Sequence, residues 1–226
     1  MNNTDRVNKL KTILEERILV VDGAMGTFIQ ALDLSADDFG GIQYEGCNEY
    51  LNLTNPNAIK FIHRQYIEAG SDIIETNSFG STPLVLREYG LGDKAYEISK
   101  TAALLAREAV EKYAPSGKTV FVAGSMGPTT KSISVTGGVT WDDLAVDYYI
   151  QAKGLIDGGA DILLVETSQD TLNVKASLAG IDRLSEEVDF DIPVAIQCTI
   201  EAMGTMLGGQ DIEAFYSSLA HRNLLW

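Results

Sequence analysis

The chain has 226 residues, enough for one or two domains. Hydrophobic residues make up 45% of it and charged residues 22%, a balance that excludes a disordered, collagen-like or disulfide-dense chain. Its 32 acidic residues outnumber 17 basic ones, and the formal net charge of −15 disfavours nucleic acid and anionic membrane as partners.

The sequence also bears on where the protein works. No stretch of it approaches the roughly 18 apolar residues that a membrane-spanning helix needs. The first residues are polar and lead into an amphipathic segment, unlike the apolar core of a secretory signal. The two cysteines, Cys47 and Cys198, fit a reducing compartment. We therefore expect a cytoplasmic protein that binds neither membrane nor nucleic acid.

Short apolar runs alternate with longer helical patterns along the whole chain. Each run reads as a strand buried on both faces, as in a parallel sheet. The predicted strands are residues 18–22, 72–77, 119–124, 161–166 and 192–198. The predicted helices are residues 56–69, 95–113, 140–157, 171–187 and 211–221. This alternation predicts an α/β fold with a parallel sheet, either doubly wound or a β/α barrel.

An internal repeat supports a series of similar units. Residues 70–77 match residues 159–168: a glycine, a small residue and an aspartate precede an apolar strand that ends in Glu-Thr. A (β/α)8 barrel needs eight units and about 250 residues, and five units are visible. We therefore expect an incomplete barrel of the TIM type, with residues 1–226 forming part of a single domain and no second domain.

Polar residues gather where the predicted strands end, the edge at which a barrel keeps its active site. The set comprises Asp22, Glu75, Thr76, Asn77, Ser78, Ser125, Glu166, Thr167, Ser168 and Gln197. Convergent carboxylates in a dry cleft suit a substrate ammonium group, or acid–base chemistry. The alternative is that each carboxylate caps a helix or bonds a neighbouring loop.

The cysteines and histidines offer little for metal binding or nucleophilic catalysis. Cys198 lies in an apolar run and reads as a buried structural thiol, whereas Cys47 stands among acidic residues that disfavour a thiolate. His63 and His221 fall on predicted helices, where surface or capping roles are expected. No spacing of these residues matches a zinc site, so we expect no metal site within the chain.

Five motifs, read together, resemble a known family. They are Val21-Asp-Gly-Ala-Met-Gly-Thr27, residues 45–56, residues 70–80, Gly124-Ser-Met-Gly-Pro128 and residues 161–170. In this order they resemble the N-terminal homocysteine-binding module of cobalamin-dependent methionine synthases, within the homocysteine S-methyltransferase family. The resemblance runs from Ile18 to the end of the chain. It implies a β/α barrel and a methyltransferase that converts homocysteine to methionine.

The resemblance also implies roles for cofactors and for particular residues. Zinc would hold the homocysteine sulfur as a thiolate, which attacks the methyl group of methylcobalamin on another module. Methyltetrahydrofolate on a further module would then restore the methyl group. Asp22 and Glu166 would contact the homocysteine amino group, while Gly23 and the Asn77–Ser78 turn would help to seat its amino-acid end.

The chain departs from the family pattern at the zinc ligands. These are three cysteines, one on the sixth strand and an adjacent pair near the end of the barrel, and the sequence stops at Trp226 before the first. We therefore expect a truncated module that binds neither zinc nor cobalamin and is inactive alone. The alternatives are a homocysteine S-methyltransferase with another methyl donor, and a non-catalytic remnant that binds an amino acid or a partner.

Overall fold

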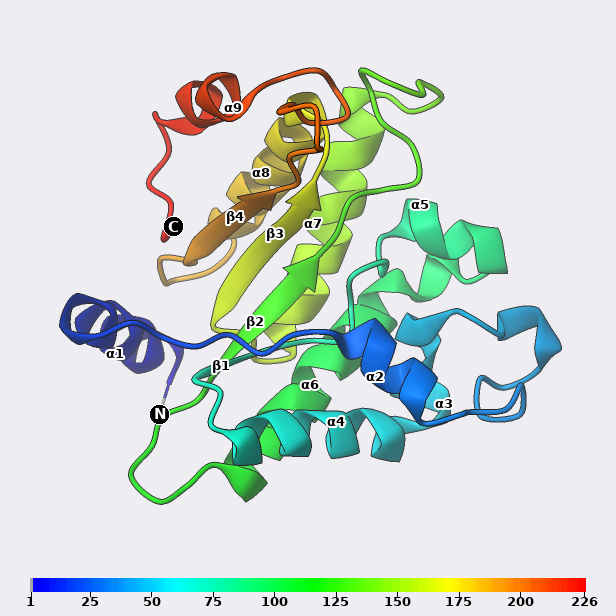
Figure 1. Cartoon of the computed structure of the whole chain (residues 1–226), viewed down its shortest axis with the longest axis vertical. Helices are drawn as coiled ribbons and strands as arrows, with labels where there is room; N and C mark the ends of the chain where they lie inside the picture. The colour runs from blue at the N-terminus through cyan, green and yellow to red at the C-terminus, as the bar shows by residue number, and fades with distance from the viewer. Residues whose placement is uncertain (1) are drawn as a thin grey trace.

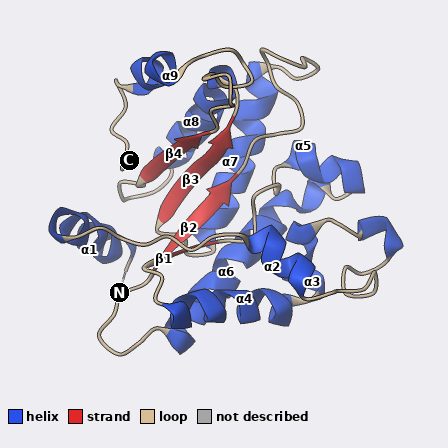
Figure 2. Cartoon of the chain, viewed as in Figure 1, coloured by secondary structure: helices blue, strands red, loops and turns tan. Residues whose placement is uncertain are grey.

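Four parallel strands form the centre of the computed structural model, which describes residues 2–226. Their bounds are β1 (Ile73–Glu75), β2 (Phe121–Met126), β3 (Ile162–Ser168) and β4 (Val194–Cys198). They lie side by side in chain order, and each pair is parallel (Figure 1). Figure 2 shows the helices that connect them gathered on one face of this sheet. The predicted α/β fold with a parallel sheet is confirmed.

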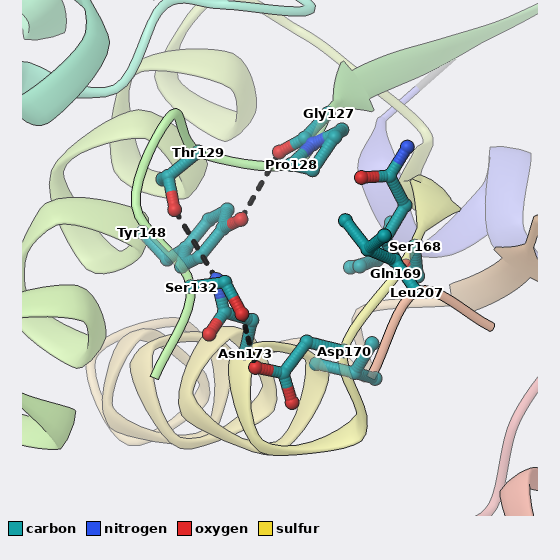
Figure 3. Close-up of a pocket in the computed structure, with 12 residues that line it drawn as sticks. Gly127, Pro128, Thr129, Ser132, Tyr148, Ser168, Gln169, Asp170, Asn173 and Leu207 are labelled. Atoms are coloured by element: carbon teal, nitrogen blue, oxygen red, sulfur yellow. Dashed lines mark hydrogen bonds between the residues drawn. The ribbon is translucent and has the colours of Figure 1, made fainter. Parts of the chain in front are cut away.

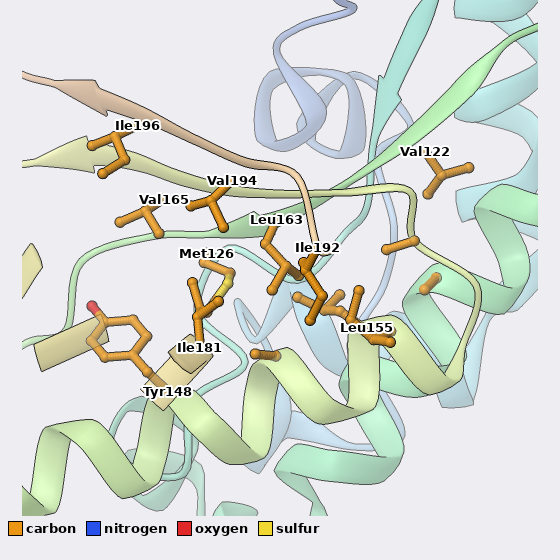
Figure 4. Close-up of a cluster of buried hydrophobic side chains, with 14 of the residues drawn as sticks. Val122, Met126, Tyr148, Leu155, Leu163, Val165, Ile181, Ile192, Val194 and Ile196 are labelled. Carbon is orange, nitrogen blue, oxygen red and sulfur yellow. The ribbon is translucent and has the colours of Figure 1, made fainter. Parts of the chain in front are cut away.

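The largest apolar cluster lies between the sheet and these connecting helices. Alternate residues of the strands, such as Leu163, Val165 and Val194, face Tyr148, Leu155 and Ile181 of the helices (Figure 4). The helices that contribute most are α6 (Ala95–Tyr113), α7 (Trp141–Asp157) and α8 (Thr171–Ser185). Burial of this apolar surface is the main source of stability for a sheet covered on one face by helices.

The opposite face of the sheet carries a second cluster, covered at its lower end by α1 (Asn3–Glu16). Leu10 of α1 is fully buried against inward-facing strand residues, with Ile13 and Leu14 beside it. The strand residues are Ile73, Phe121, Ala123, Ile162, Leu164 and Ala195. The N-terminal amphipathic segment is therefore part of the folded unit, and it covers the lower end of this face.

The repeated aspartates explain why the same motif precedes β1 and β3. Asp72 accepts a hydrogen bond from the Val20 amide at 3.0 Å and pairs with Arg17, whose guanidinium holds the pKa of Asp72 well below its usual range. Asp161 accepts one from the Val122 amide at 2.9 Å. In each case the carboxylate links the start of a new strand to the strand before it. Both copies of the motif therefore have the same structural role.

The first predicted strand is only partly formed. Within residues 18–22 a single bridge joins Val21 to Ile73, and Ile18 and Val20 are 89% and 58% exposed. Burial on both faces was therefore a wrong prediction for this segment. The physical reason is that Ile18 and Val20 belong to none of the apolar clusters among the described residues, although Val21 contacts the inner cluster.

The end of the chain lies along the free edge of β4. The Leu225 amide donates to the Val194 carbonyl at 2.7 Å, and the Ile196 amide donates to the Trp226 carbonyl at 3.2 Å. These two bonds hold the chain end against β4, although the sheet itself ends at that strand.

The predicted helices are present with nearly the predicted bounds. α4 spans Pro56–Ala69, with the Asn55 side chain as its N-cap and Gly70 in the left-handed conformation at its end, and α9 spans Ile212–Leu219. Thr140 and Asp143 form the expected capping box of α7. The sequence did not predict several short elements: α2 (Met25–Ala31), α3 (Leu51–Thr54), α5 (Pro83–Leu86) and 3-10 turns at Ile42–Tyr44, Asn48–Tyr50, Arg87–Tyr89 and Gly92–Lys94. No helix among the described residues combines the length and apolarity that crossing a membrane would require.

Close helix packing gives the first testable prediction. A Cβ on Gly180 of α8 would lie 2.5 Å from the Ala145 carbonyl oxygen of α7. Alanine favours helices more than glycine, yet here it must push two helix backbones apart. We expect Gly180→Ala to lower the free energy of unfolding by about 1–3 kcal/mol, the usual range for overpacking. Urea denaturation measures this, and an equal or increased stability would contradict the packing described.

Candidate functional site

A cavity of about 280 Å³ opens at the carboxyl ends of β1, β2 and β3. Segments that are distant in the sequence build its wall. The lining residues are Ala24, Met25, Gly26, Asn48, Glu49, Glu75, Thr76, Asn77, Ser78, Phe79, Ser125 and Glu166. Because strand carboxyl ends are where parallel α/β folds bind ligands, this cavity is the candidate site.

The structure brings the predicted site residues together. Asn77, Ser78 and Glu166 line the cavity. Asp22 and Gly23 directly precede its wall at Ala24, and Asp22 Oδ1 accepts a hydrogen bond from the Glu75 amide at 2.9 Å. These five residues therefore lie at one end of the sheet, in or beside the same cavity.

The turn at Gly23 has open space beside it. A Cβ added to Gly23 would meet nothing within 4 Å, so no protein neighbour requires glycine at this position. Ala24 then adopts the left-handed conformation at φ 43°, and α2 begins at Met25. Left-handed backbone is uncommon outside glycine and often marks a functional turn. The geometry leaves room for a ligand to approach the backbone here.

A β-bulge places Glu166 at the cavity. The register between β3 and β4 shifts between Val165 and Ser168, and Thr167 has φ 55°. A β-branched residue in this conformation is strained, and bulges of this kind redirect side chains next to active sites. Ser125 Oγ donates to Glu166 Oε1 at 2.5 Å and fixes that carboxylate against β2.

Asn77 and Ser78 are tied into the wall by their own side chains. Asn77 Nδ2 donates to the Asn48 carbonyl at 2.7 Å, and Ser78 Oγ donates to the Ser125 carbonyl at 2.7 Å. Asn52 Nδ2 completes this connection by donating to the Asn77 carbonyl at 2.8 Å. These bonds hold the 48–52 segment against the end of β1, so both residues shape the cavity.

The titratable groups discussed for this site are carboxyl groups. Burial raises the pKa of Asp22 to about 7, opposed by the bond from the Glu75 amide and reinforced by Glu166. Burial, followed by Glu166 and Asp22, raises the pKa of Glu75 to about 8. Burial also raises the pKa of Glu166, against the hydrogen bond from Ser125. No Lys, Arg or His is among the described residues that line the cavity, so the site favours a cationic ligand group.

Several lining residues had no predicted role in substrate binding. Glu75 and Ser125 belong to the polar set at the strand ends, and each lies two residues after an inward-facing residue, Ile73 or Ala123, so that it points to the same face of the sheet. That spacing could have assigned both to the cavity. Glu49 comes from a long loop, where its Oε1 accepts from the Gly80 amide at 2.8 Å. Loop residues of this kind carry no periodic signal.

Other residues of interest lie away from the cavity. Gln197 is exposed, Cys47 is buried in a separate apolar cluster and Cys198 packs on the helix side of β4. The expected surface role of His63 is wrong: its ring is fully buried and burial lowers its pKa to about 4. The reason is that α4 turns this position toward the core. Within residues 2–226 no group of three or more His, Cys, Asp or Glu side chains could hold a metal ion.

A second cavity of about 30 Å³ lies beside the loop that follows β2 (Figure 3). Its wall includes Asp170, the N-cap of α8, which is 2% exposed. Asp170 accepts hydrogen bonds from Ser132 Oγ at 2.5 Å, from the Ser134 amide at 2.8 Å and from Ser134 Oγ at 2.9 Å. Burial alone would raise the pKa of Asp170, but these bonds together lower it. Asp170 thus fastens residues 132–134 to α8.

This attachment gives a second prediction. Lys131 is exposed and is the one tryptic site between residues 128 and 139. We expect Asp170→Ala to release the loop and to speed tryptic cleavage after Lys131 by roughly tenfold or more, because each lost hydrogen bond is worth about 1 kcal/mol. Mass spectrometry of timed digests measures this. Asp189→Ala, at an exposed position, is the control, and equal cleavage rates in the two variants would contradict the attachment.

Comparison with known proteins identifies the family of this chain. Residues 19–226 match the family model described as homocysteine S-methyltransferase. The chain belongs to the homocysteine S-methyltransferase family.

Two of the relatives that the chain matches are mycobacterial methionine synthases. It is 42% identical over 205 residues to methionine synthase of Mycobacterium tuberculosis (strain ATCC 25618 / H37Rv), covering 91% of the chain and 17% of that protein. It is 42% identical over 201 residues to methionine synthase of Mycobacterium leprae (strain TN), covering 89% of the chain and 16% of that protein. The chain therefore spans about a sixth of the length of these relatives.

Solved structures share the fold. The metallated form of the homocysteine methyltransferase MmuM from Escherichia coli superposes with a TM-score of 0.78 at 22% identity, covering 95% of this chain and 74% of that chain. Its oxidized form gives a TM-score of 0.76 at 23% identity, covering 93% and 72%. At this identity the likeness supports the fold alone.

Proposed function

We propose that the chain is a homocysteine-binding part of a methionine synthase, which transfers a methyl group to homocysteine. The observation that carries the proposal is the acidic cavity at the strand ends, formed within a chain of this family. The identity of 42% to two methionine synthases supports it over other members of the family.

In this proposal the carboxylates of Asp22 and Glu166 bind the ammonium group of homocysteine. Both are half-buried beside the cavity, where a charge pair is stronger than in water. The open space at Gly23 and the turn at Asn77–Ser78 accommodate the amino-acid end. The substrate is thereby oriented before its sulfur reacts, which is how fixed positioning lowers a reaction barrier.

We further propose that zinc and cobalamin serve the complete enzyme, as the resemblance implies, with zinc acting on the sulfur and cobalamin carrying the methyl group. The described residues do not fit a zinc site. They include no candidate metal-binding group, and Cys47 and Cys198 lie in different apolar clusters. The roles proposed for this chain therefore concern its carboxylates and hydroxyls, and we expect no methyl transfer by the chain alone.

We also propose a (β/α)8 barrel, incomplete within the described residues and belonging to one homocysteine-binding domain over residues 1–226. The strictly sequential strand order and the apolar inner face support it, as does the hydrogen bond of Leu225 to the free edge of β4. Partner modules for folate and cobalamin agree with the length of the relatives. Two free cysteines agree with a cytoplasmic location.

The test compares two ligands that differ only in the amine. Calorimetric titration of the chain with L-homocysteine and with 4-mercaptobutanoate, which lacks the amino group, measures what the carboxylates contribute. We expect L-homocysteine to bind at least about tenfold more tightly, since a charge-assisted hydrogen bond is worth about 1.5–3 kcal/mol. Equal affinities, or binding of neither ligand, would contradict the proposed site.

Two other functions are alternatives to this proposal. A homocysteine S-methyltransferase with another methyl donor would share this cavity, and the fold of the E. coli homocysteine methyltransferase is compatible with it. A non-catalytic remnant would bind an amino acid or a partner without methyl transfer. Activity assays of the chain within its complete enzyme, with methylcobalamin or another donor, separate the three.

A further inference from the structure

One carboxylate of the acidic cavity has no partner. Asp22 accepts a bond from the Glu75 amide and Glu166 accepts one from Ser125 Oγ. Among residues 2–226, no donor or cation contacts the carboxylate of Glu75 itself. Yet Glu75 lines the cavity and is half-buried, on the inward-facing side of β1. No contact of the folded chain therefore explains why an acidic side chain occupies this position.

The titratable groups around Glu75 are mainly carboxylates. Asp22 precedes α2, Glu166 lies near the end of β3 and Glu49 comes from a loop that lines the cavity. The remaining titratable neighbour is Tyr66 of α4. None of these groups is a cation. Several like charges that share one small cavity cannot all be ionised at neutral pH, so the empty site must hold protons.

We propose that Glu75 is a further substrate-binding residue of this site and that it releases a proton to solvent when the substrate ammonium group enters. The proposal rests on the proposed function. In the empty site Glu75 is a neutral carboxylic acid, and in the complex it is a carboxylate paired with the ammonium group. The proton it loses goes to water, so charge and atoms balance.

The chemistry of an ammonium group fits this arrangement. It carries three N–H donors and no acceptor. Asp22, Glu75 and Glu166 together offer one carboxylate for each donor. An incoming positive charge favours the ionised form of a nearby acid, and this drives the release of the proton. The site would therefore select an amine over a neutral analogue through proton release as well as hydrogen bonding.

Proton release can be counted directly. Calorimetry of L-homocysteine binding near pH 7, in buffers of different ionisation enthalpy, gives the number of protons released. We expect the wild-type chain to release up to about one proton more than Glu75→Gln, because glutamine is isosteric and cannot ionise. The affinity of the wild type should rise with pH between 6 and 8.5, and that of Glu75→Gln should rise less. Glu213→Gln, on exposed α9, is the control.

A ligand-free measurement keeps the proposal separate from the proposed function. Because the folded chain binds the Glu75 proton more tightly than the unfolded chain, the free energy of unfolding of the wild type should fall relative to Glu75→Gln as pH rises from 5 to 9. Parallel pH profiles, or equal proton release in both proteins, would overturn the proposal. If the wild type fails to bind L-homocysteine, the proposed function fails, and the unfolding profiles still decide whether Glu75 holds a proton.

Discussion

Asp161→Ala is expected to lower the free energy of unfolding by about 3–5 kcal/mol, the usual cost of removing one partner from a buried ion pair. The Asp161 side chain is 1% exposed and lies between Arg6 of α1 and Arg107 of α6, each at 2.5 Å. It also accepts from the Val122 amide. Without Asp161, two guanidinium groups that are each 15% exposed lose the carboxylate they share.

Equilibrium urea denaturation measures this effect, and α1 provides a matched control. Lys11 of the same helix pairs with Asp191 at 3.0 Å, but the Asp191 side chain is 73% exposed. Asp191→Ala should therefore cost at most about 1 kcal/mol, as surface ion pairs do. If Asp161→Ala costs no more than Asp191→Ala, the buried ion pairs do not hold α1 to the sheet as described.

Glu166→Gln is expected to weaken the binding of L-homocysteine by about 10- to 100-fold, because a charged hydrogen bond to the ammonium group becomes a neutral one. The change keeps the shape of the side chain and allows Ser125 Oγ to remain a donor. Since burial raises the pKa of Glu166, removing its charge should leave the folded chain at least as stable. Calorimetric titration measures the affinity.

The control for this change is Glu186→Gln at the exposed end of α8. It removes the same charge from the chain at a distance from the cavity. Unchanged affinity in Glu186→Gln separates a local contact from the general effect of net charge. An affinity in Glu166→Gln equal to that of the wild type would remove Glu166 from the proposed site.

Elements with strong local signals were predicted well from the sequence. Asn55, Pro56 and Gly70 mark both ends of α4, and the predicted bounds are those observed. Capping residues and helix periodicity act within a few residues, so they can be interpreted without knowing the fold. The segment 18–22 shows the limit, because its apolar character does not reveal that Ile18 and Val20 belong to none of the apolar clusters within residues 2–226.

The candidate site was predicted in part for the same reason. Asp22, Asn77 and Glu166 lie at the ends of predicted strands, and parallel strands bring such positions to one edge. The bulge that strains Thr167 and the return of Glu49 from its loop depend on contacts between distant segments. The unpaired state of Glu75 likewise emerges only when the surrounding side chains are placed.

A crystal structure of the chain soaked with L-homocysteine tests the central claim most directly. The account predicts homocysteine in the cavity at the ends of β1, β2 and β3, with its nitrogen within hydrogen-bond distance of Glu166 and Asp22. Homocysteine bound elsewhere, or with its carboxylate facing these acids, would contradict the account.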